Sequence, residues 1–158
     1  MTTPGPNARQ SGRACVFALA GEQFAADIRH TREVVVLPDR TAVPRAPAHI
    51  LGVANLRGNV VPIVDIGFAL GLPPRPASET LRNIVLEDAG VQVAVPTDEV
   101  LGLEPVDDIR PVNASPYGEL AVGLLRRSDG TVATLLDIPR LIDAVRVASP
   151  TMREKETP

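Results

Sequence analysis

The chain has 158 residues, which is the size of one domain that can bury a core without disulfides or structural metals. Hydrophobic residues make up 44% of it, charged residues make up 22%, and no apolar run approaches about 18 residues, so the composition favours a globular protein and excludes a membrane-spanning helix. The net charge of −3 and the scarcity of aromatic residues argue against binding to nucleic acid, which requires a basic surface and stacking side chains.

The first part of the chain predicts short strands separated by glycine turns. Residues 1–13 are polar and without apolar periodicity, so we expect a disordered leader there. Residues 14–20 and 24–28 flank Gly21 and predict a β-hairpin. Residues 33–37 are rich in valine and predict a further strand.

A second hairpin is expected from residues 53–56 and 60–64, with residues 57–59 as its turn. Asp65 follows this hairpin directly. Its carboxylate is expected to cap a short helix, which ends before Gly71.

The second half of the chain repeats this order of elements. A hairpin around Gly90 matches the first hairpin, and Glu99 is matched with Glu33. Residues 130–138 match residues 58–66, including the aspartate before the short helix. We infer that the chain contains two copies of one small β unit.

Each copy has only about 60 to 70 residues, near the size at which a single core is marginal, so we expect each to curl into a small barrel and to pack on the other. The predicted fold is all-β, with a groove at the seam between the copies. One domain is expected over residues 14–147, with a first barrel over about 14–72 and a second over about 80–147, and an exchange of strands between them is left open. Residues 148–158 are expected to be a disordered tail.

Residues that carry chemistry are too few for a metal site or an ordinary active site. The single cysteine, Cys15, excludes a disulfide framework and is interpreted as a buried strand residue. His30 and His49 lie in no metal-ligand spacing and are interpreted as surface or loop residues. No phosphate-binding loop, dinucleotide fingerprint or nucleophile elbow occurs. The residues therefore make a metalloenzyme, a hydrolase, a dinucleotide-binding protein and a nucleoside triphosphatase improbable, and they leave contact with other proteins as the expected activity.

Two aspartates, Asp65 and Asp137, invite comparison with the paired carboxylates of acid–base catalysts. Each directly precedes a short predicted helix in its own copy. Their equivalent places favour helix capping over catalysis.

One stretch is specific enough to indicate a family. Residues 52–65 read GVANLRGNVVPIVD, and they follow the matching segments at residues 17–19, 24–28 and 33–34. From about Val16 to Ile142 the chain closely resembles the CheW family of bacterial chemotaxis coupling proteins. The second half of the chain follows the family pattern more loosely.

This resemblance implies two tandem, intertwined, SH3-like five-stranded β-barrels with short helices. It also implies a cytoplasmic scaffold without catalytic activity or cofactor and without direct insertion into the membrane. Family members join a CheA-type histidine kinase, through its own CheW-like regulatory domain, to the cytoplasmic tip of a methyl-accepting chemoreceptor. Because the sequence shows no phosphoacceptor helix, ATP-binding segment or receiver-like repeat, the resemblance points to the stand-alone adaptor.

The resemblance implies a receptor-binding site centred on Arg57, at the turn of the second hairpin. A guanidinium there suits the carboxylates and carbonyls of a partner, although a solubilising turn residue is the alternative. Thr31 stands where an aliphatic residue is usual, Ile28 could instead belong to the core, and Gly52 has a backbone role first. The predicted receptor-binding residues are Ile28, Thr31, Gly52, Asn55, Leu56 and Arg57.

The resemblance also implies that Glu33, Val34 and Val36 bind the kinase regulatory domain. The alternative for Glu33 is a solvated strand residue opposite a basic side chain. The loop of residues 112–117 is short and polar, whereas relatives can expose a hydrophobic residue to the kinase in this loop. We therefore assign no second kinase contact there. Residues 66–68 also depart from the family, which usually has Leu-Arg after this aspartate.

Two competing functions stay open. One is a CheW-like adaptor of another kinase pathway, such as surface motility. The other is a small-molecule-binding barrel, possibly an enzyme, with its pocket at the seam between the copies. Such a pocket would need converging polar groups, and apart from Arg57 and scattered carboxylates the sequence offers none.

Overall fold

The computed structural model describes residues 12–37, 40–73, 82–112 and 114–147. The predicted tail and residues 1–11 of the predicted leader lie outside the described residues. The last residue of that leader, Arg13, is the first residue of a strand, so regular structure begins one residue earlier than expected.

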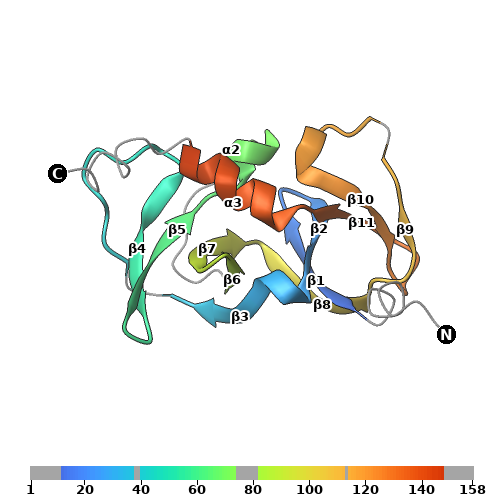
Figure 1. Ribbon diagram of the computed structural model, residues 1–158, viewed down its shortest axis with the longest axis horizontal. Helices are drawn as coiled ribbons and strands as arrows, with labels where there is room; N and C mark the ends of the chain where they lie inside the picture. The colour runs from blue at the N-terminus through green and yellow to red at the C-terminus, as the bar shows by residue number, and fades with distance from the viewer. Residues whose placement is uncertain (1–11, 38–39, 74–81, 113, 148–158) are drawn as a thin grey trace.

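The described elements are mostly short strands, as the sequence predicts, and two small 3-10 turns and two α-helices accompany them (Figure 1). In chain order they are β1 (Arg13–Leu19), β2 (Glu22–Asp27), η1 (Ile28–His30), β3 (Thr31–Val36), β4 (Ile50–Leu56), β5 (Asn59–Val64), α2 (Gly67–Leu70), β6 (Arg82–Asp88), β7 (Val91–Thr97), β8 (Glu99–Pro105), β9 (Ile109–Arg110), η2 (Gly118–Leu120), β10 (Ala121–Arg126), β11 (Val132–Leu136) and α3 (Ile138–Val147).

The strands form two sheets, which confirms the all-β prediction. Among the described residues, sheet A has six strands in the order β8-β1-β2-β11-β10-β9, and sheet B has five in the order β3-β6-β7-β5-β4. Sheet A has one strand more than the five expected, because the two-residue β9 pairs with β10. Figure 1 shows the two curled sheets side by side, with α3 lying across them.

Neither sheet coincides with residues 14–72 or 80–147. Sheet B takes the hairpin β6–β7 from the second copy, and sheet A takes the hairpin β1–β2 from the first. Each copy therefore lends its hairpin to the other. In the finished fold, all the strands of sheet B lie between residues 31 and 97, whereas the described strands of sheet A come from before and after that range.

The two sheets follow one plan, as the register of their strands shows. β8 runs beside β1 and skips Leu101 in the ladder, and β3 runs beside β6 and skips Arg32 at the matching place. In this register Glu33 corresponds to Gly102, not to Glu99 as the sequence repeat indicated. The Glu-Val pairs look alike locally, but the paired hairpins fix an alignment that differs by three residues.

Two glycines allow the chain to pass close to itself at equivalent points of the two sheets. A Cβ atom on Gly52, in β4, would lie 2.8 Å from the carbonyl oxygen of Thr41. A Cβ atom on Gly123, in β10, would lie 2.6 Å from the carbonyl oxygen of Arg110. Side chains cannot occupy such positions without moving the backbone, so both glycines are required by packing.

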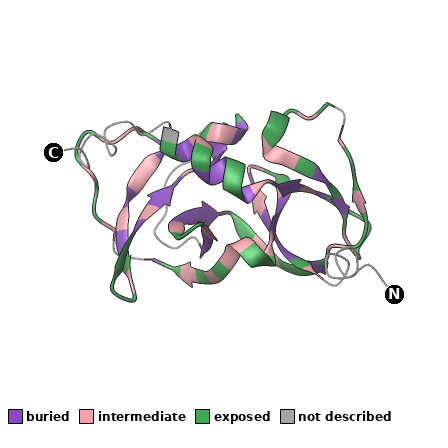
Figure 2. Ribbon diagram, in the orientation of Figure 1, coloured by how far each residue is buried: buried purple, intermediate pink, exposed green. Residues whose placement is uncertain are grey.

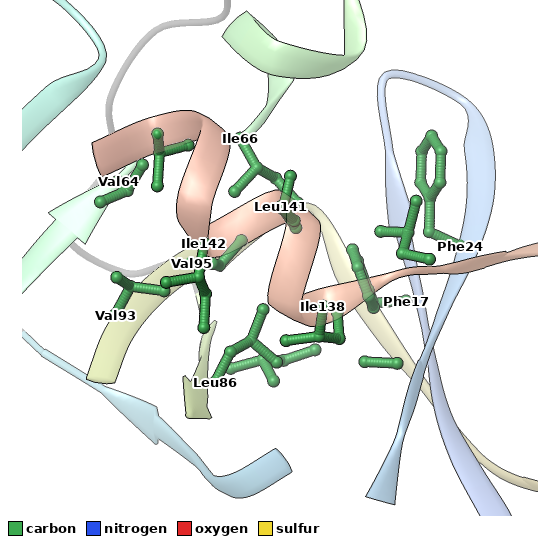
Figure 3. Close-up of a cluster of buried hydrophobic side chains, with 14 of the residues drawn as sticks. Phe17, Phe24, Val64, Ile66, Leu86, Val93, Val95, Ile138, Leu141 and Ile142 are labelled. Carbon is green, nitrogen blue, oxygen red and sulfur yellow. The ribbon is translucent and has the colours of Figure 1, made fainter. Parts of the chain in front are cut away.

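The buried apolar side chains form three clusters. The largest lies between the two sheets beneath α3 and joins residues of both, among them Phe17, Leu86, Leu141 and Ile142 (Figure 3). Smaller clusters fill sheet A, around Val16 and Leu125, and sheet B, around Val61 and Ile63. Figure 2 shows buried residues along strands of both sheets and along α3, where they alternate with exposed ones.

Buried apolar side chains therefore fill the interior of the seam between the two sheets, and the groove expected at the seam stays a prediction. Either sheet alone encloses a cluster of only five or six buried residues. Such a core is too small to stabilise a unit of this size. Most of the apolar burial is instead made where the two sheets and α3 meet.

Candidate partner-binding site

The turn between β4 and β5 presents Arg57 to solvent. Arg57 and Gly58 have φ angles of 53° and 88°, the pattern of the type I′ turn that joins two antiparallel strands most tightly. The Asn55 side chain accepts a hydrogen bond from the Gly58 amide at 2.9 Å and fixes the turn. The Arg57 side chain is 72% exposed, as expected for the tip of a hairpin.

Arg57 forms an ion pair with Glu33 on β3, through Nη1 and Oε2. β3 and β4 are the two edge strands of sheet B, so this pair bridges its open side. The basic partner foreseen as the alternative for Glu33 is thus Arg57 itself. An exposed pair of this kind contributes about 0 to 1 kcal/mol, so a ligand can compete for the guanidinium at little cost to the fold.

A groove of about 460 Å³ opens between β3 and the β4–β5 turn. It brings together three residues that the sequence had assigned to two different partners: Glu33, Leu56 and Arg57. It also contains three that sequence reasoning missed, namely Arg32, Asn59 and Gln92. Asn59 and Arg32 are sequence neighbours of assigned residues, and that proximity was the available signal. Gln92 reaches the groove only through the pairing of β6 with β7.

A row of polar side chains crosses three strands at the groove. The Arg32 side chain, on β3, contacts Glu87 Oε1, on β6, at 2.7 Å through Nε. Gln92 Nε2, on β7, donates to the same Glu87 oxygen at 3.4 Å. Cross-strand pairs of this kind hold side chains in place on a sheet surface.

Ile28 is the first residue of η1, and Thr31, which follows η1, is the first residue of β3. Ile28 is exposed, so the alternative that placed it in the core is wrong. The Thr31 hydroxyl donates to the carbonyl oxygen of Asp27 at 3.0 Å and closes the turn. Burial by itself would raise the pKa of Asp27, but the hydrogen bonds from Arg29 and the charges of Arg29 and His30 outweigh it and lower that pKa.

The residues assigned to the kinase lie on both faces of β3. Glu33 points toward the groove, whereas Val34 and Val36 alternate with it along the strand and are exposed. Gly52 is buried, and its visible role is the close passage of residue 41. Its role in receptor binding stays a prediction.

Several other residues can be compared with their predicted roles. Asp137 Oδ1 accepts the Arg140 amide at 3.1 Å, which confirms it as the cap of α3. Asp65 Oδ1 accepts a hydrogen bond from the Gly67 amide at 3.0 Å. Asp65 itself lies one residue before the N-cap of α2, which is Ile66. Cys15 is buried, as predicted, and burial raises the pKa of its thiol.

His49 lies in the turn before β4, which agrees with the prediction of a surface or loop residue as far as the loop is concerned, but it is not at the surface. His49 is buried, its ring stacks on Phe68 at 4.5 Å between centroids, and its Nε2 lies 3.3 Å from the carbonyl oxygen of Val145. Phe68 is one of the residues that depart from the family pattern. The departure therefore supplies the ring that covers a buried histidine beside α3.

Two other kinds of feature are absent from the described part of the chain. No helix there combines the length and the apolarity that crossing a membrane requires. No group of three or more histidine, cysteine, aspartate or glutamate side chains is placed there to hold a metal ion.

Comparisons with known proteins agree on one family. The CheW-like domain matches residues 13–146. Chemotaxis protein CheW of Rhizobium meliloti is 34% identical over 72% of this chain and 70% of its own length. A probable chemotaxis protein CheW of Rhizobium etli is 34% identical over 56% of this chain, and the match spans 64% of that protein.

Two further relatives extend this result. Protein PilI of Pseudomonas aeruginosa is 34% identical over 62% of this chain and 56% of its own length. The crystal structure of a scaffolding protein CheW from Thermoanaerobacter tengcongensis superposes with a TM-score of 0.73 at 27% identity. That superposition covers 83% of this chain and 92% of the solved one.

Proposed function

This chain belongs to the CheW-like domain family, and on that premise we propose that it is a cytoplasmic adaptor that couples the tips of chemoreceptors to a CheA-type histidine kinase. The premise rests on a family match over nearly all the described residues and on similarity to a protein described as a scaffold. Proteins of this family are adaptors and not enzymes, so the activity proposed is the joining of two partners.

The observation that carries the receptor half of the proposal is the position of Arg57. Its guanidinium is exposed at a hairpin tip beside an open groove, and only one of its terminal nitrogens pairs with Glu33. The planar fork of an arginine suits the carboxylates and main-chain carbonyls of a partner helix. Asn55 and Leu56, which flank it, would complete the contact, with Ile28 and Thr31 beside the start of β3.

The kinase half rests on β3 as an edge strand. Val34 and Val36 expose apolar surface on the side of β3 that faces away from Arg57. A regulatory domain of the same fold would cover this surface while a receptor occupies the groove. Glu33 would then act through its pair with Arg57 and not as a separate kinase contact.

A second candidate function keeps the same sites and changes the pathway. The similarity to protein PilI supports an adaptor of a different kinase system, because that protein carries a name other than chemotaxis protein. No specific observation favours the small-molecule alternative, and the interior of the seam between the two sheets is packed with apolar side chains.

Receptor binding is tested by the variant Arg57→Glu in a pull-down with a dimeric chemoreceptor tip and a CheA-type kinase. We expect receptor binding to fall at least tenfold while the kinase still co-purifies. The matched control is Arg126→Glu, because Arg126 is 53% exposed on sheet A and has one acidic neighbour, Asp108, at 3.9 Å. Unchanged receptor binding in the Arg57 variant, or equal loss in the control, would contradict the proposal.

The kinase surface needs its own variant. Val36→Asp places a charge on the exposed apolar face of β3 and leaves the groove untouched. We expect it to lose the kinase and to keep the receptor. A variant that loses both partners or neither would show that β3 does not form a separate kinase surface.

A further inference from the structure

We propose that Arg32 is a second anion-binding residue of the groove, so that the groove takes an acidic protein segment with one carboxylate for Arg32 and another for Arg57. This inference rests on the proposed function and names the chemistry of the partner at that site. Nothing in the sequence singled out Arg32, which lies between two assigned residues, Thr31 and Glu33.

The backbone gives Arg32 an unusual position. It is the residue that β3 skips in its pairing with β6, so it stands outside the regular ladder. Its side chain is 58% exposed and lines the same groove as Arg57. The groove therefore has one guanidinium from β3 and another from the β4–β5 turn.

Among the described residues, each of these guanidiniums pairs with one carboxylate. Glu87 contacts Arg32 at Nε, and this contact does not use the two terminal nitrogens of Arg32. Glu33 contacts Arg57 at Nη1. Anchoring of this kind orients the donors before a ligand arrives, which reduces the entropy lost on binding.

The charges and polar groups of the groove favour an acidic occupant. Its lining includes two arginines and one glutamate, and Glu87 beside Arg32 balances the second positive charge, so the guanidinium donors and not a net positive charge favour an anion there. Asn59 and Gln92 add amide groups to the lining, and Leu56 adds an apolar side chain. Two separated guanidiniums with amides around them fit a protein segment that carries two acidic side chains better than they fit a single small anion.

The other copy of the β unit shows that the fold does not require an arginine at this position. The residue that β8 skips, at the place equivalent to Arg32, is Leu101. Leu101 packs against the core of sheet A. The bulge therefore accommodates an apolar residue, and the exposed charge at Arg32 is free to serve binding.

The test measures the affinity of the full chain for a purified dimeric chemoreceptor tip by calorimetry at two NaCl concentrations. Wild type should bind more weakly at the higher concentration, because charged contacts are screened. Arg32→Glu should bind at least tenfold more weakly and depend less on salt, and Arg32→Lys should keep part of the affinity. Circular dichroism checks that each variant is folded.

The matched control is Arg29→Glu. Arg29 is 74% exposed, lies three residues before Arg32 and is also paired with one carboxylate, but it does not line the groove. We expect wild-type affinity for this control. If Arg32→Glu binds like wild type while Arg57→Glu is weakened, the inference about Arg32 is wrong and the proposed function stands; if neither variant is weakened, both are wrong.

Discussion

At one pair of equivalent positions, sheet A has a buried ion pair and sheet B has apolar side chains, and the effect of this difference on stability can be tested. In sheet A, Arg127 Nε contacts Glu104 Oε2 at 3.2 Å, and the two side chains are only 11% and 8% exposed. By the register of the strands, Glu104 occupies the place of Val35, and Arg127 occupies the place of Leu56. Val35 and Leu56 pack against the core of sheet B. A buried ion pair thus stands where the other copy has an apolar contact.

We expect Glu104→Val and Arg127→Leu each to lower the free energy of unfolding by about 3 kcal/mol, because each strands a buried charge. The cost lies at the lower end of the usual range because each stranded charge keeps other partners. In Glu104→Val, Arg127 would keep Asp129 at 3.3 Å and Gln23 at 3.2 Å, and in Arg127→Leu, Glu104 would keep the hydroxyl of Ser128 at 3.0 Å. The double variant copies the pair of sheet B and should lose no more than about 1 to 2 kcal/mol.

Urea denaturation followed by circular dichroism measures all four proteins, and equal denaturant slopes would show that the same surface is exposed in each. The double-mutant cycle should give a coupling energy of at least about 4 kcal/mol. A double variant that loses about 6 kcal/mol, the sum of the two single losses, would refute the equivalence of the two sites.

Three further predictions concern stability. Asp27→Asn should destabilise the protein at pH 7, and its difference in stability from wild type should shrink below about pH 4. The reason is that a carboxylate with a lowered pKa contributes stability above its unfolded pKa, and this stability is lost as the pH falls through its folded pKa. Melting curves of both proteins across this pH range check the prediction. Leu141→Ala removes a side chain buried beneath α3 and should cost about 2 to 5 kcal/mol in one cooperative transition, measured by urea unfolding; separate transitions for the two sheets would contradict the shared core. Gly52→Ala should cost on the order of 1 to 3 kcal/mol in thermal unfolding, because its Cβ atom would meet the Thr41 carbonyl, and a stability equal to wild type would show that residue 41 can move away.

The local features of the fold could be predicted from the sequence because each depends on neighbouring residues. The hairpins around Gly21, Gly58 and Gly90, the cap at Asp137 and the end of α2 at Gly71 follow from turn and cap chemistry, and all are present in the structure. The position of Arg57 at an exposed turn follows in the same way.

What could not be predicted depends on long-range pairing. The exchange of hairpins leaves no trace in local periodicity, because a strand looks the same whichever sheet it joins. The burial of His49 depends on Phe68 and on the carbonyl of Val145, almost a hundred residues away in the chain. The ion pair between Arg57 and Glu33 likewise requires the two edges of sheet B to face each other.

The exchange of hairpins also determines how motion can pass through an adaptor of this kind. The chain leaves sheet A after Asp27, beside Ala14, and returns at Asp98, whose amide bonds the carbonyl of Ala18. These two crossings lie at opposite ends of β1, about 14 Å apart at the ordinary rise per strand residue. Because the two sheets are joined by two chain crossings that lie apart, sheet B can rotate against sheet A only about the line through both crossings. The apolar side chains packed between the sheets oppose that rotation as well. A partner that tilts sheet B must therefore move sheet A with it as one rigid body.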